Sequence, residues 1–224
     1  MQLSIIVPML NEEAALPMFL EYLQPFLKCG CEILLVDGGS SDASAALAQR
    51  AGFSVFHSPR GRARQMNAGA RLASGDVLLF LHADTRLPAA AMAQMEQALS
   101  GQSSTWGRFD VQIEGKPCML RAIAFFMSLR SRVTGICTGD QAIFVRRGAF
   151  EMVGGFPDQS LMEDVALCGR LRRLGFPVCL KGPAITSGRR WETRGVWRTI
   201  LLMWRLRFSY WRGVSPETLA KDYR

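Results

Sequence analysis

Short apolar runs that end in polar clusters constrain the fold of this chain most strongly. Residues 3–8 (LSIIVP), 32–36 (EILLV) and 77–81 (VLLFL) are of strand length and lack polar alternation, which is typical of parallel strands covered on both faces. Residues 53–57 are expected to form a further, short strand. Helical spacing between these runs predicts the crossovers that parallel strands need. We therefore predict an α/β fold with a Rossmann-like, mostly parallel sheet and helices on both faces.

The boundaries of the helices are predicted from capping signals and apolar spacing. Apolar residues recur with helical spacing from Leu16 to Leu23, and Asn11 is expected to cap this helix with Glu12 in its first turn. Beyond residue 104 the regular alternation of strands and helices fades, and that part of the chain is expected to determine specificity. The other expected elements are helices over residues 43–51, 65–73, 118–129 and 162–174 and strands over 108–114 and 142–146.

Composition limits the class of protein. With 49% hydrophobic residues, the 224-residue chain can bury a core and is not disordered. Its net charge of +8 permits a phosphate-bearing partner, but no other feature points to nucleic acid, and none is expected as a partner. The six scattered cysteines are expected to be reduced. The N-terminal sequence lacks the pattern of a secretory signal, so we expect a cytoplasmic location.

Polar clusters follow three of the predicted strands. They contain Asn11 and Glu12, residues 37–42 (DGGSSD), and residues 82–85 (HADT). Ligands of parallel α/β sheets collect beyond the carboxyl ends of the strands, where Asp84 could hold a divalent cation against phosphate oxygens. Plain turns and helix caps would explain the same residues. The glycine-rich signatures of dinucleotide-binding and P-loop proteins are both missing from these turns.

Two further charged groups have an open interpretation. Arg60, Arg62 and Arg64 precede the helix predicted over 65–73, and together with Asn67 they suit either a diphosphate or a solvated loop. Residues 163–164, a glutamate followed by an aspartate, stand in the first turn of another helix. Stabilisation by the helix dipole would alone justify acids at that position.

These motifs, in this order, resemble those of family 2 glycosyltransferases with the GT-A fold. The segments that carry the resemblance over nearly residues 3–192 are SIIVPMLNEE, VDGGSSD, LHAD, the Gly154-Gly155-Phe156 turn and MED. The segments RARQMNAGA, LFLHADT, TGDQAIFVRR and GGFP-x4-LMEDVAL also closely resemble a small bacterial subgroup. Its members are transferases associated with radical-SAM and selenodomain proteins, some of them linked to arsenosugar biosynthesis.

The resemblance implies a metal-dependent, inverting transfer of one sugar from a nucleotide-diphosphate sugar to an acceptor hydroxyl. Asp164 would be the general base and Glu163 would orient it. Asp84 would hold Mn²⁺ or Mg²⁺ on the donor diphosphate, and Asp37 would bind the base or ribose. The donor site implied in this way comprises Pro8, Asn11, Glu12, Asp37, Gly38, Arg64, Asn67, His82, Ala83 and Asp84.

Two positions depart from the family pattern, and two pairs of residues extend the site. Gly38 replaces a second aspartate, and His82 replaces the first aspartate of the DxD motif. Residues 187–191 (SGRRW) partly resemble the Q-x-x-R-W motif of processive members, in which the arginine would grip the diphosphate and the tryptophan would stack on an acceptor sugar. The acceptor or diphosphate contacts expected are Asp140, Gln141, Arg190 and Trp191, although a simple turn would also explain Asp140.

The last part of the chain carries an apolar stripe at helical spacing. It comprises Trp197, Ile200, Leu201, Trp204, Phe208 and Trp211, and Arg198, Arg205 and Arg212 recur every seven residues on another face. This pattern suits a peripheral helix on anionic lipid at the inner face of a membrane. It also suits a helix docked on the catalytic domain or on a second copy in a homodimer.

We therefore expect one catalytic domain and an appended helical segment. The GT-A domain would span residues 1–192, with a nucleotide-sugar-binding half (1–104) and an acceptor half (105–192), and a C-terminal amphipathic helical extension would follow over 193–224. A nucleotidyltransferase is an alternative, although residues 8–15 (PMLNEEAA) lack its glycine-rich, lysine-bearing loop. A non-catalytic nucleotide-sugar-binding protein is the other alternative.

Overall fold

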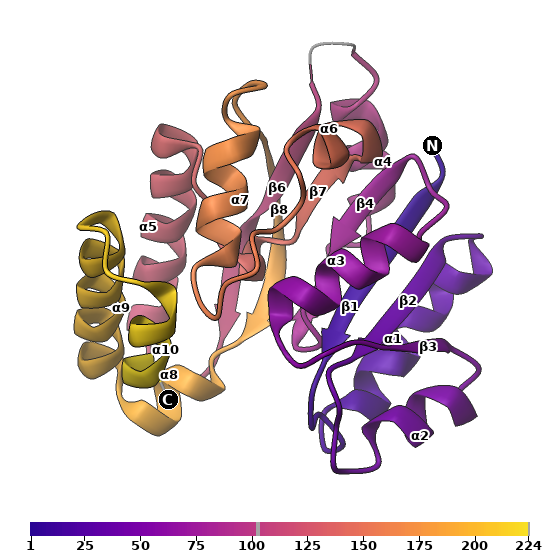
Figure 1. Ribbon diagram of the computed structural model, residues 1–224, viewed down its shortest axis with the longest axis horizontal. Coiled ribbons are helices and arrows are strands. Elements are labelled where there is room, and N and C mark those ends of the chain that lie inside the picture. The colour runs from indigo at the N-terminus through magenta and orange to yellow at the C-terminus, as the bar shows by residue number, and fades with distance from the viewer. Residues whose placement is uncertain (102–103, 224) are drawn as a thin grey trace.

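The computed structural model describes residues 1–101 and 104–223. Its centre is an eight-stranded sheet with the order β3-β2-β1-β4-β7-β6-β8-β5 (Figure 1). The first four strands in this order are parallel to one another, as expected, so their carboxyl ends meet at one edge. They are β1 (Leu3–Met9), β2 (Glu32–Asp37), β3 (Ser54–His57) and β4 (Val77–Phe80).

The second half of the sheet is mixed. Strand β7 (Ile143–Arg146) is antiparallel to both β4 and β6 (Trp106–Glu114). Strand β8 (Val178–Ser187) is parallel to β6, and the two-residue β5 (Thr85–Arg86) is antiparallel to β8. Pairing with β5 brings the chain after β4 next to the end of β8, so residues from both halves meet there.

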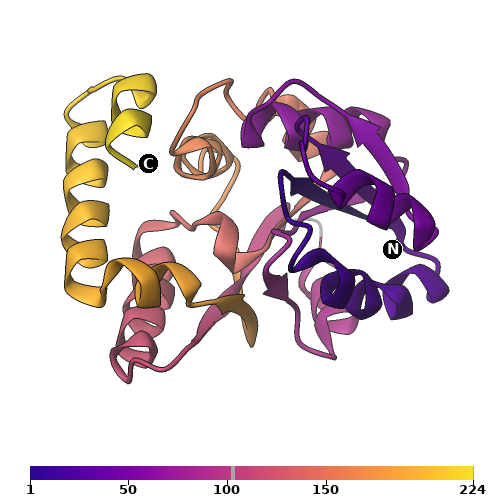
Figure 2. The ribbon, with the colours of Figure 1, turned by 90° about the horizontal axis from the view of Figure 1, so that it is seen from below.

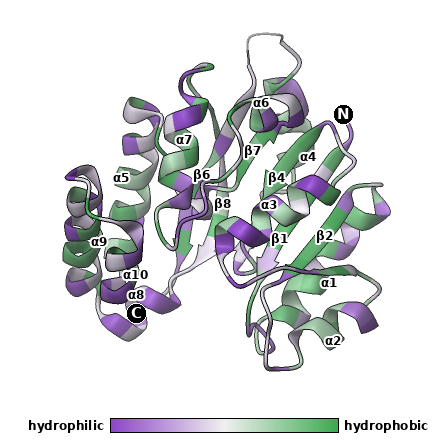
Figure 3. Ribbon diagram, viewed as in Figure 1, coloured by the Kyte–Doolittle hydropathy of each residue, from purple (hydrophilic) through white to green (hydrophobic). Residues whose placement is uncertain are grey.

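Helices cover both faces of the sheet. They are α1 (Leu16–Lys28), α2 (Ser44–Arg50), α3 (Arg62–Leu72), α4 (Ala91–Ala98), α6 (Arg147–Met152) and α7 (Glu163–Leu171). Because successive strand residues point to opposite sides, Ile5 and Val7 pack with α1, α2 and α4, whereas Ile6 packs with α3, α6 and α7. Strands β2, β4 and β7 are hydrophobic along most of their length (Figure 3).

The remaining helices gather at one side of the molecule. They are α5 (Met119–Thr134), α8 (Arg189–Arg194), α9 (Val196–Trp211) and α10 (Pro216–Tyr223), and Figure 2 shows α9 along this side with α10 beside it. Leu206 of α9 packs with Leu161, Met162 and Leu219 in a separate small core. No helix in the described part of the chain is long and apolar enough to cross a membrane.

The predicted cap of the first helix is wrong. Helix α1 begins at Leu16 without a side-chain cap, and no acidic residue lies in its first turn. The side-chain oxygen of Asn11 instead accepts a hydrogen bond from the Ser41 backbone N–H at 2.8 Å. Asn11 is used to join the loops after β1 and β2, with its own backbone in the left-handed region (φ 54°).

The structure places the expected start of the C-terminal extension inside a helix, and the division into a domain and an extension stays a prediction. Residue 192 falls within α8, so the extension expected over 193–224 is continuous with the domain before it. Residues 102–103, next to the expected division between the halves, and residue 224 lie outside the described residues. The extension is helical as expected, but it packs on the domain through Leu206 and its neighbours, not through the tryptophan stripe.

Candidate functional site

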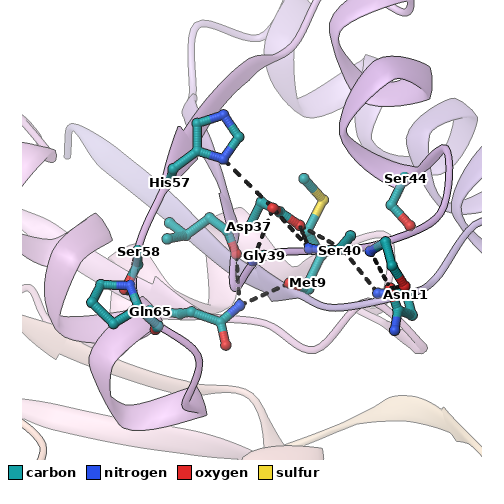
Figure 4. Close-up of polar contacts among 12 residues, drawn as sticks. Met9, Asn11, Asp37, Gly39, Ser40, Ser44, His57, Ser58 and Gln65 are labelled. Atoms are coloured by element: carbon teal, nitrogen blue, oxygen red, sulfur yellow. Dashed lines mark hydrogen bonds and ion pairs between the residues drawn. The ribbon is translucent and has the colours of Figure 1, made fainter.

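A polar network joins the ends of β1 and β2 (Figure 4). The carboxylate of Asp37, which is buried, accepts hydrogen bonds from the backbone N–H groups of Gly39 (3.0 Å) and Ser40 (3.1 Å). The Nε2 atom of Gln65 donates to the carbonyl oxygens of Met9 and Val36, both at 2.8 Å. This network fixes the turn after β2, and Gly39 has a positive φ of 86° that side-chain-bearing residues disfavour.

Gln65 also explains why Gly38 stands where relatives of the implied family carry a second aspartate. A Cβ atom added to Gly38 would lie 2.9 Å from the side chain of Gln65. Gln65 was not identified as a site residue from the sequence, because its role depends on a contact between α3 and two strand ends. The aspartate that the family pattern suggests would therefore need Gln65 to move.

The first polar loop lies against the turn after β2. The backbone N–H of Asn11 donates to Ser40 Oγ (2.9 Å), and that of Glu12 donates to Ser44 Oγ (2.8 Å). Pro8 pairs with Val36 in the sheet, so it belongs to the same strand end. Burial and the charge of Asp84 raise the pKa of Glu12 against the opposing charge of Arg189. The pKa of Glu12 thus depends on charges from both halves of the chain.

A second group of predicted residues lines one cavity of about 210 Å³. The predicted residues among its lining are His82, Asp84, Asp140, Glu163, Asp164, Arg190 and Trp191. Asp84 follows β4, whereas Asp164 stands in the first turn of α7. The fold therefore brings the strand-end acid and the helix-start acid to one cavity, although they are 80 positions apart in the sequence.

His82 and Asp140 lie side by side in the wall of this cavity. His82 Nδ1 lies 3.4 Å from Asp140 Oδ1. Burial alone would raise the pKa of Asp140, but the hydrogen bond from His82 and the charges of His82, Arg62 and Arg190 lower it below its ordinary value. The ring of His82 also packs against Gly139, where an added Cβ would lie only 2.2 Å from it.

The two acids at the start of α7 have different surroundings. Glu163 is buried, and its Oε1 atom forms an ion pair with Arg62 Nη1 at 3.2 Å. Burial raises the pKa of Glu163, in spite of the opposing charge of Arg62. Asp164 accepts hydrogen bonds from the backbone N–H groups of Gly139 (2.9 Å) and Val165 (2.7 Å). These bonds hold its carboxylate at the cavity in a fixed orientation.

Asp84 has the carboxylate oxygens that a hard divalent cation prefers as ligands. One of its oxygens accepts a hydrogen bond from Thr85 Oγ1 at 3.2 Å, and the side chain lies at the cavity surface. Within residues 1–101 and 104–223, no three His, Cys, Asp or Glu side chains are grouped to hold a metal. A single carboxylate suits Mg²⁺ or Mn²⁺ when substrate phosphates and water supply the other ligands.

The Arg190-Trp191 pair contributes from α8. The guanidinium carbon of Arg190 lies 4.2 Å from the centre of the Tyr223 ring, which is a cation–π contact. Burial is the main cause of a lowered pKa for Arg190, and the neighbouring charge of Arg194 adds to it. Trp191 packs on the small apolar cluster that contains Ile113. The end of the chain therefore helps to position a residue of the cavity.

Four predicted donor-site or acceptor-site residues lie elsewhere. Arg64 forms an exposed ion pair with Asp158 (2.7 Å). Asn67 donates to the carbonyl oxygen of Phe156 (2.8 Å) and accepts from its N–H (3.0 Å), so it holds the turn before α7. The remaining two residues are buried inside the protein. Gln141 donates a hydrogen bond to Ser131 Oγ, and Ala83 lies in the core.

Among the charged and aromatic residues that line the cavity, sequence reasoning missed two and did not select a third. Arg62 belongs to the predicted basic cluster, from which only Arg64 is expected in the donor site. In the structure, it is Arg62 that pairs with Glu163. Arg207 and Tyr223 come from α9 and α10 and also line the cavity. No motif marks these two, because they reach the site only through the packing of the C-terminal helices.

Solved structures share this fold. The mannosyltransferase PcManGT from Pyrobaculum calidifontis, solved with GDP-Man and Mn²⁺, aligns with a TM-score of 0.67 at 19% identity and covers 99% of this chain and 68% of its own. TarS 1-349 from S. aureus, solved with UDP-GlcNAc, aligns with a TM-score of 0.66 at 18% identity over 84% of this chain and 58% of its own. These likenesses confirm the expected GT-A fold.

Sequence relatives and a family model agree with the fold. A PGL/p-HBAD biosynthesis glycosyltransferase of Mycobacterium bovis is 32% identical over 161 residues, which are 68% of this chain and 62% of that protein. The chain spans 45 to 62% of the length of the curated relatives compared with it. The narrower resemblance to the radical-SAM-associated subgroup stays a prediction. The model of Glycosyl transferase family 2 matches residues 4–152, and the chain therefore belongs to that family.

Proposed function

We propose that this protein transfers one sugar from a nucleotide-diphosphate sugar to an acceptor hydroxyl, with inversion at the anomeric carbon. The observation that carries the proposal is that Asp84 and Asp164, from different halves of the chain, line one cavity. Such a transfer needs a site that binds the leaving diphosphate and a base that receives the acceptor proton. The two carboxylates match these two needs.

The donor is proposed to bind between the strand ends and the cavity. PcManGT was solved with GDP-Man and TarS with UDP-GlcNAc, which supports a nucleotide sugar as the donor class here. In the turn after Asp37, a Cβ atom added to Gly39 would meet no atom within 4 Å, so this glycine leaves room for a base or ribose to approach the backbone. Asp84 would hold Mn²⁺ or Mg²⁺, which when bound offsets the negative charge of the diphosphate. Arg190 lines the same cavity and offers a second positive charge.

The proton transfer is assigned to Asp164. As the acceptor oxygen forms its bond to the anomeric carbon, the bond from that carbon to the diphosphate breaks, and the hydroxyl proton passes to the Asp164 carboxylate. The hydrogen bonds from Gly139 and Val165 keep this carboxylate in place before reaction. Glu163 acts on its neighbour indirectly, since its ion pair with Arg62 fixes the start of α7. Glu163 is therefore a positioning residue.

Two substitutions separate the donor and base roles. Asp164→Asn should keep the affinity for the nucleoside diphosphate and lower the release of that product from the sugar donor by about 100-fold or more, the usual contribution of a general base. Asp84→Ala should weaken binding of the nucleoside diphosphate in the presence of Mn²⁺ and leave metal-free binding unchanged. Retained turnover in Asp164→Asn would contradict the base assignment. Binding of the nucleotide without any turnover in the unmodified protein would indicate a non-catalytic binder.

We also propose that α9 contacts an anionic lipid surface. Trp197, Trp204 and Trp211 are 67%, 70% and 78% exposed, and they occupy the side of α9 opposite the packed Leu206. Tryptophan is enriched at membrane interfaces, and a basic flank complements anionic headgroups. The seams of helical dimers instead favour Leu, Ile and Val. A second copy of the chain on this stripe is the outcome that would contradict the lipid proposal.

A further inference from the structure

Two arginines near the candidate base have enclosed nitrogen atoms without hydrogen-bond partners. They are Nη2 of Arg207 and both Nε and Nη2 of Arg130, and none of them has an acceptor in the described part of the chain. Arg207 stands on α9 and lines the same cavity as Asp164, and Arg130 stands on α5. Because enclosed polar groups of native proteins nearly always have a partner, these nitrogens need an explanation.

No hydrogen bond or ion pair supplies that partner. Both oxygens of Asp164 accept hydrogen bonds from backbone N–H groups, and no ion pair joins this carboxylate to either arginine within residues 1–101 and 104–223. Burial and the nearby charge of Arg207 lower the pKa of Arg130 to about 10, although Asp164 opposes this. Burial also lowers the pKa of Arg207. The single negative charge of Asp164 therefore offsets only part of the positive charge of the two arginines, and their enclosed donors lack an acceptor until an anion binds.

The arrangement of the donors indicates the kind of anion. Guanidinium groups bind phosphate through paired N–H donors, more specifically than a lysine does. A phosphate monoester carries nearly two negative charges at neutral pH, so one such group can neutralise both arginines. The donor diphosphate is assigned to the Asp84 side of the cavity. The anion beside Asp164 therefore belongs to the other substrate.

We propose that Arg207, supported by the nearby positive charge of Arg130, binds a phosphate monoester group of the acceptor beside the hydroxyl that Asp164 deprotonates. This inference rests on the proposed function, because it takes Asp164 to face the acceptor. It adds the class of acceptor, which is a hydroxyl compound that also carries phosphate. The same phosphate chemistry is offered by soluble phosphorylated compounds and by phosphorylated lipids.

The test uses inorganic phosphate as the probe on the full chain. Phosphate is titrated by calorimetry, at constant ionic strength, into protein saturated with its preferred nucleoside diphosphate and Mg²⁺, so that the donor side is occupied. Arg207→Met should weaken phosphate binding about tenfold or more, since it removes charge-assisted hydrogen bonds. Arg130→Met should weaken phosphate binding less, because it removes only a nearby positive charge. Arg121→Met is the matched control, because it removes an equal charge from an exposed position of α5 outside this cavity and should leave phosphate affinity unchanged.

The thermal midpoint separates a binding role from a structural one. Removing an unpartnered enclosed cation should leave the midpoint of the ligand-free protein unchanged or raised in Arg207→Met, and phosphate should raise the midpoint of the unmodified protein only. A lowered midpoint in ligand-free Arg207→Met would indicate a structural role and overturn the inference. Where Arg207→Met fails to fold, Arg207→Lys, which keeps the charge but not the fork of donors, should still bind phosphate more weakly than the unmodified protein.

The failures of the two proposals are distinguishable. If no nucleoside diphosphate binds the unmodified protein, the proposed function fails. If the nucleotide binds but phosphate does not, or if phosphate binds equally to Arg207→Met and the unmodified protein, the acceptor inference is overturned. If phosphate does bind, glycerol 3-phosphate and vesicles containing phosphatidic acid are used as competitors, to identify whether the acceptor phosphate belongs to a soluble compound or to a lipid. Competition by the first supports a soluble acceptor, competition by the vesicles alone supports a lipid acceptor, and competition by neither overturns the inference.

Discussion

At the scale of single residues, Asn67 holds the turn that precedes the candidate base. Its side chain bonds both the N–H and the carbonyl oxygen of Phe156. Asn67→Ala leaves these two backbone groups unpaired and should lower the free energy of unfolding by about 1–3 kcal/mol, measured by urea unfolding. Arg64→Ala, which removes only an exposed ion pair from the same helix, is the matched control and should leave unfolding and nucleotide affinity unchanged. A nucleotide affinity that falls in Arg64→Ala would restore that residue to the donor site.

Because Glu163 is buried, the free energy of unfolding should depend on pH, and the sign of this dependence follows from the burial. Because its pKa is raised in the folded protein, the folded state binds more protons than the unfolded state between the ordinary value of 4.5 and the raised value. The stability of the folded protein therefore falls as pH rises through this window. Glu163→Gln removes the effect, so the free energy of unfolding of the unmodified protein minus that of the variant should be smaller at pH 7 than at pH 4. An equal difference at both pH values would contradict the assignment.

The carboxylates of the cavity could be found from the sequence, whereas the arginines could not. Asp84 lies in the polar cluster that follows β4, and Asp164 lies in the first turn of α7, so local patterns place both. Which arginine of the basic cluster faces the cavity depends on where α3 begins. The helix was expected to begin at residue 65, but it begins at Arg62. That shift of almost one turn changes which side chains share a face.

At the scale of the elements, α9 carries a testable surface. The triple substitution Trp197→Gln, Trp204→Gln, Trp211→Gln should abolish co-sedimentation with vesicles that contain an anionic lipid, because it removes the exposed aromatic stripe. Phe176→Gln is the control, since Phe176 is also largely exposed but lies outside α9. The unmodified protein should bind less to neutral vesicles and at high salt. A change from dimer to monomer in the triple variant, without vesicle binding by the unmodified protein, would favour a second copy as the partner.

The elements of the first half were more predictable than those of the second. Continuous apolar runs mark β1, β2 and β4 because these strands are buried on both faces. Strand β8 contains Gly182 and Pro183, both poor strand formers, and it was not predicted. The register with β6 shifts between Phe109 and Asp110, opposite this part of β8. Pairing with β6 therefore forms β8 in spite of its local sequence.

At the scale of the whole molecule, the candidate site lies between parts of the chain that are far apart in sequence. The parallel half supplies the turn at Asp37 and the carboxylate of Asp84, and α7 supplies Asp164. The C-terminal helices close the cavity with Arg207 and Tyr223. Such a site depends on the packing of α9 and α10, which the family motifs do not describe.

The central claim is that the strand ends bind the nucleotide of a sugar donor. The most direct test is a calorimetric titration of UDP, GDP, CDP and dTDP into the protein, with and without Mn²⁺, repeated on Asp37→Asn and Asp84→Ala. We predict that one of the four binds preferentially and more tightly with metal. Asp37→Asn should weaken its binding with and without Mn²⁺, and Asp84→Ala should lose only the gain from metal. Binding of none of the four to the unmodified protein, or equal binding to Asp37→Asn, would contradict the claim.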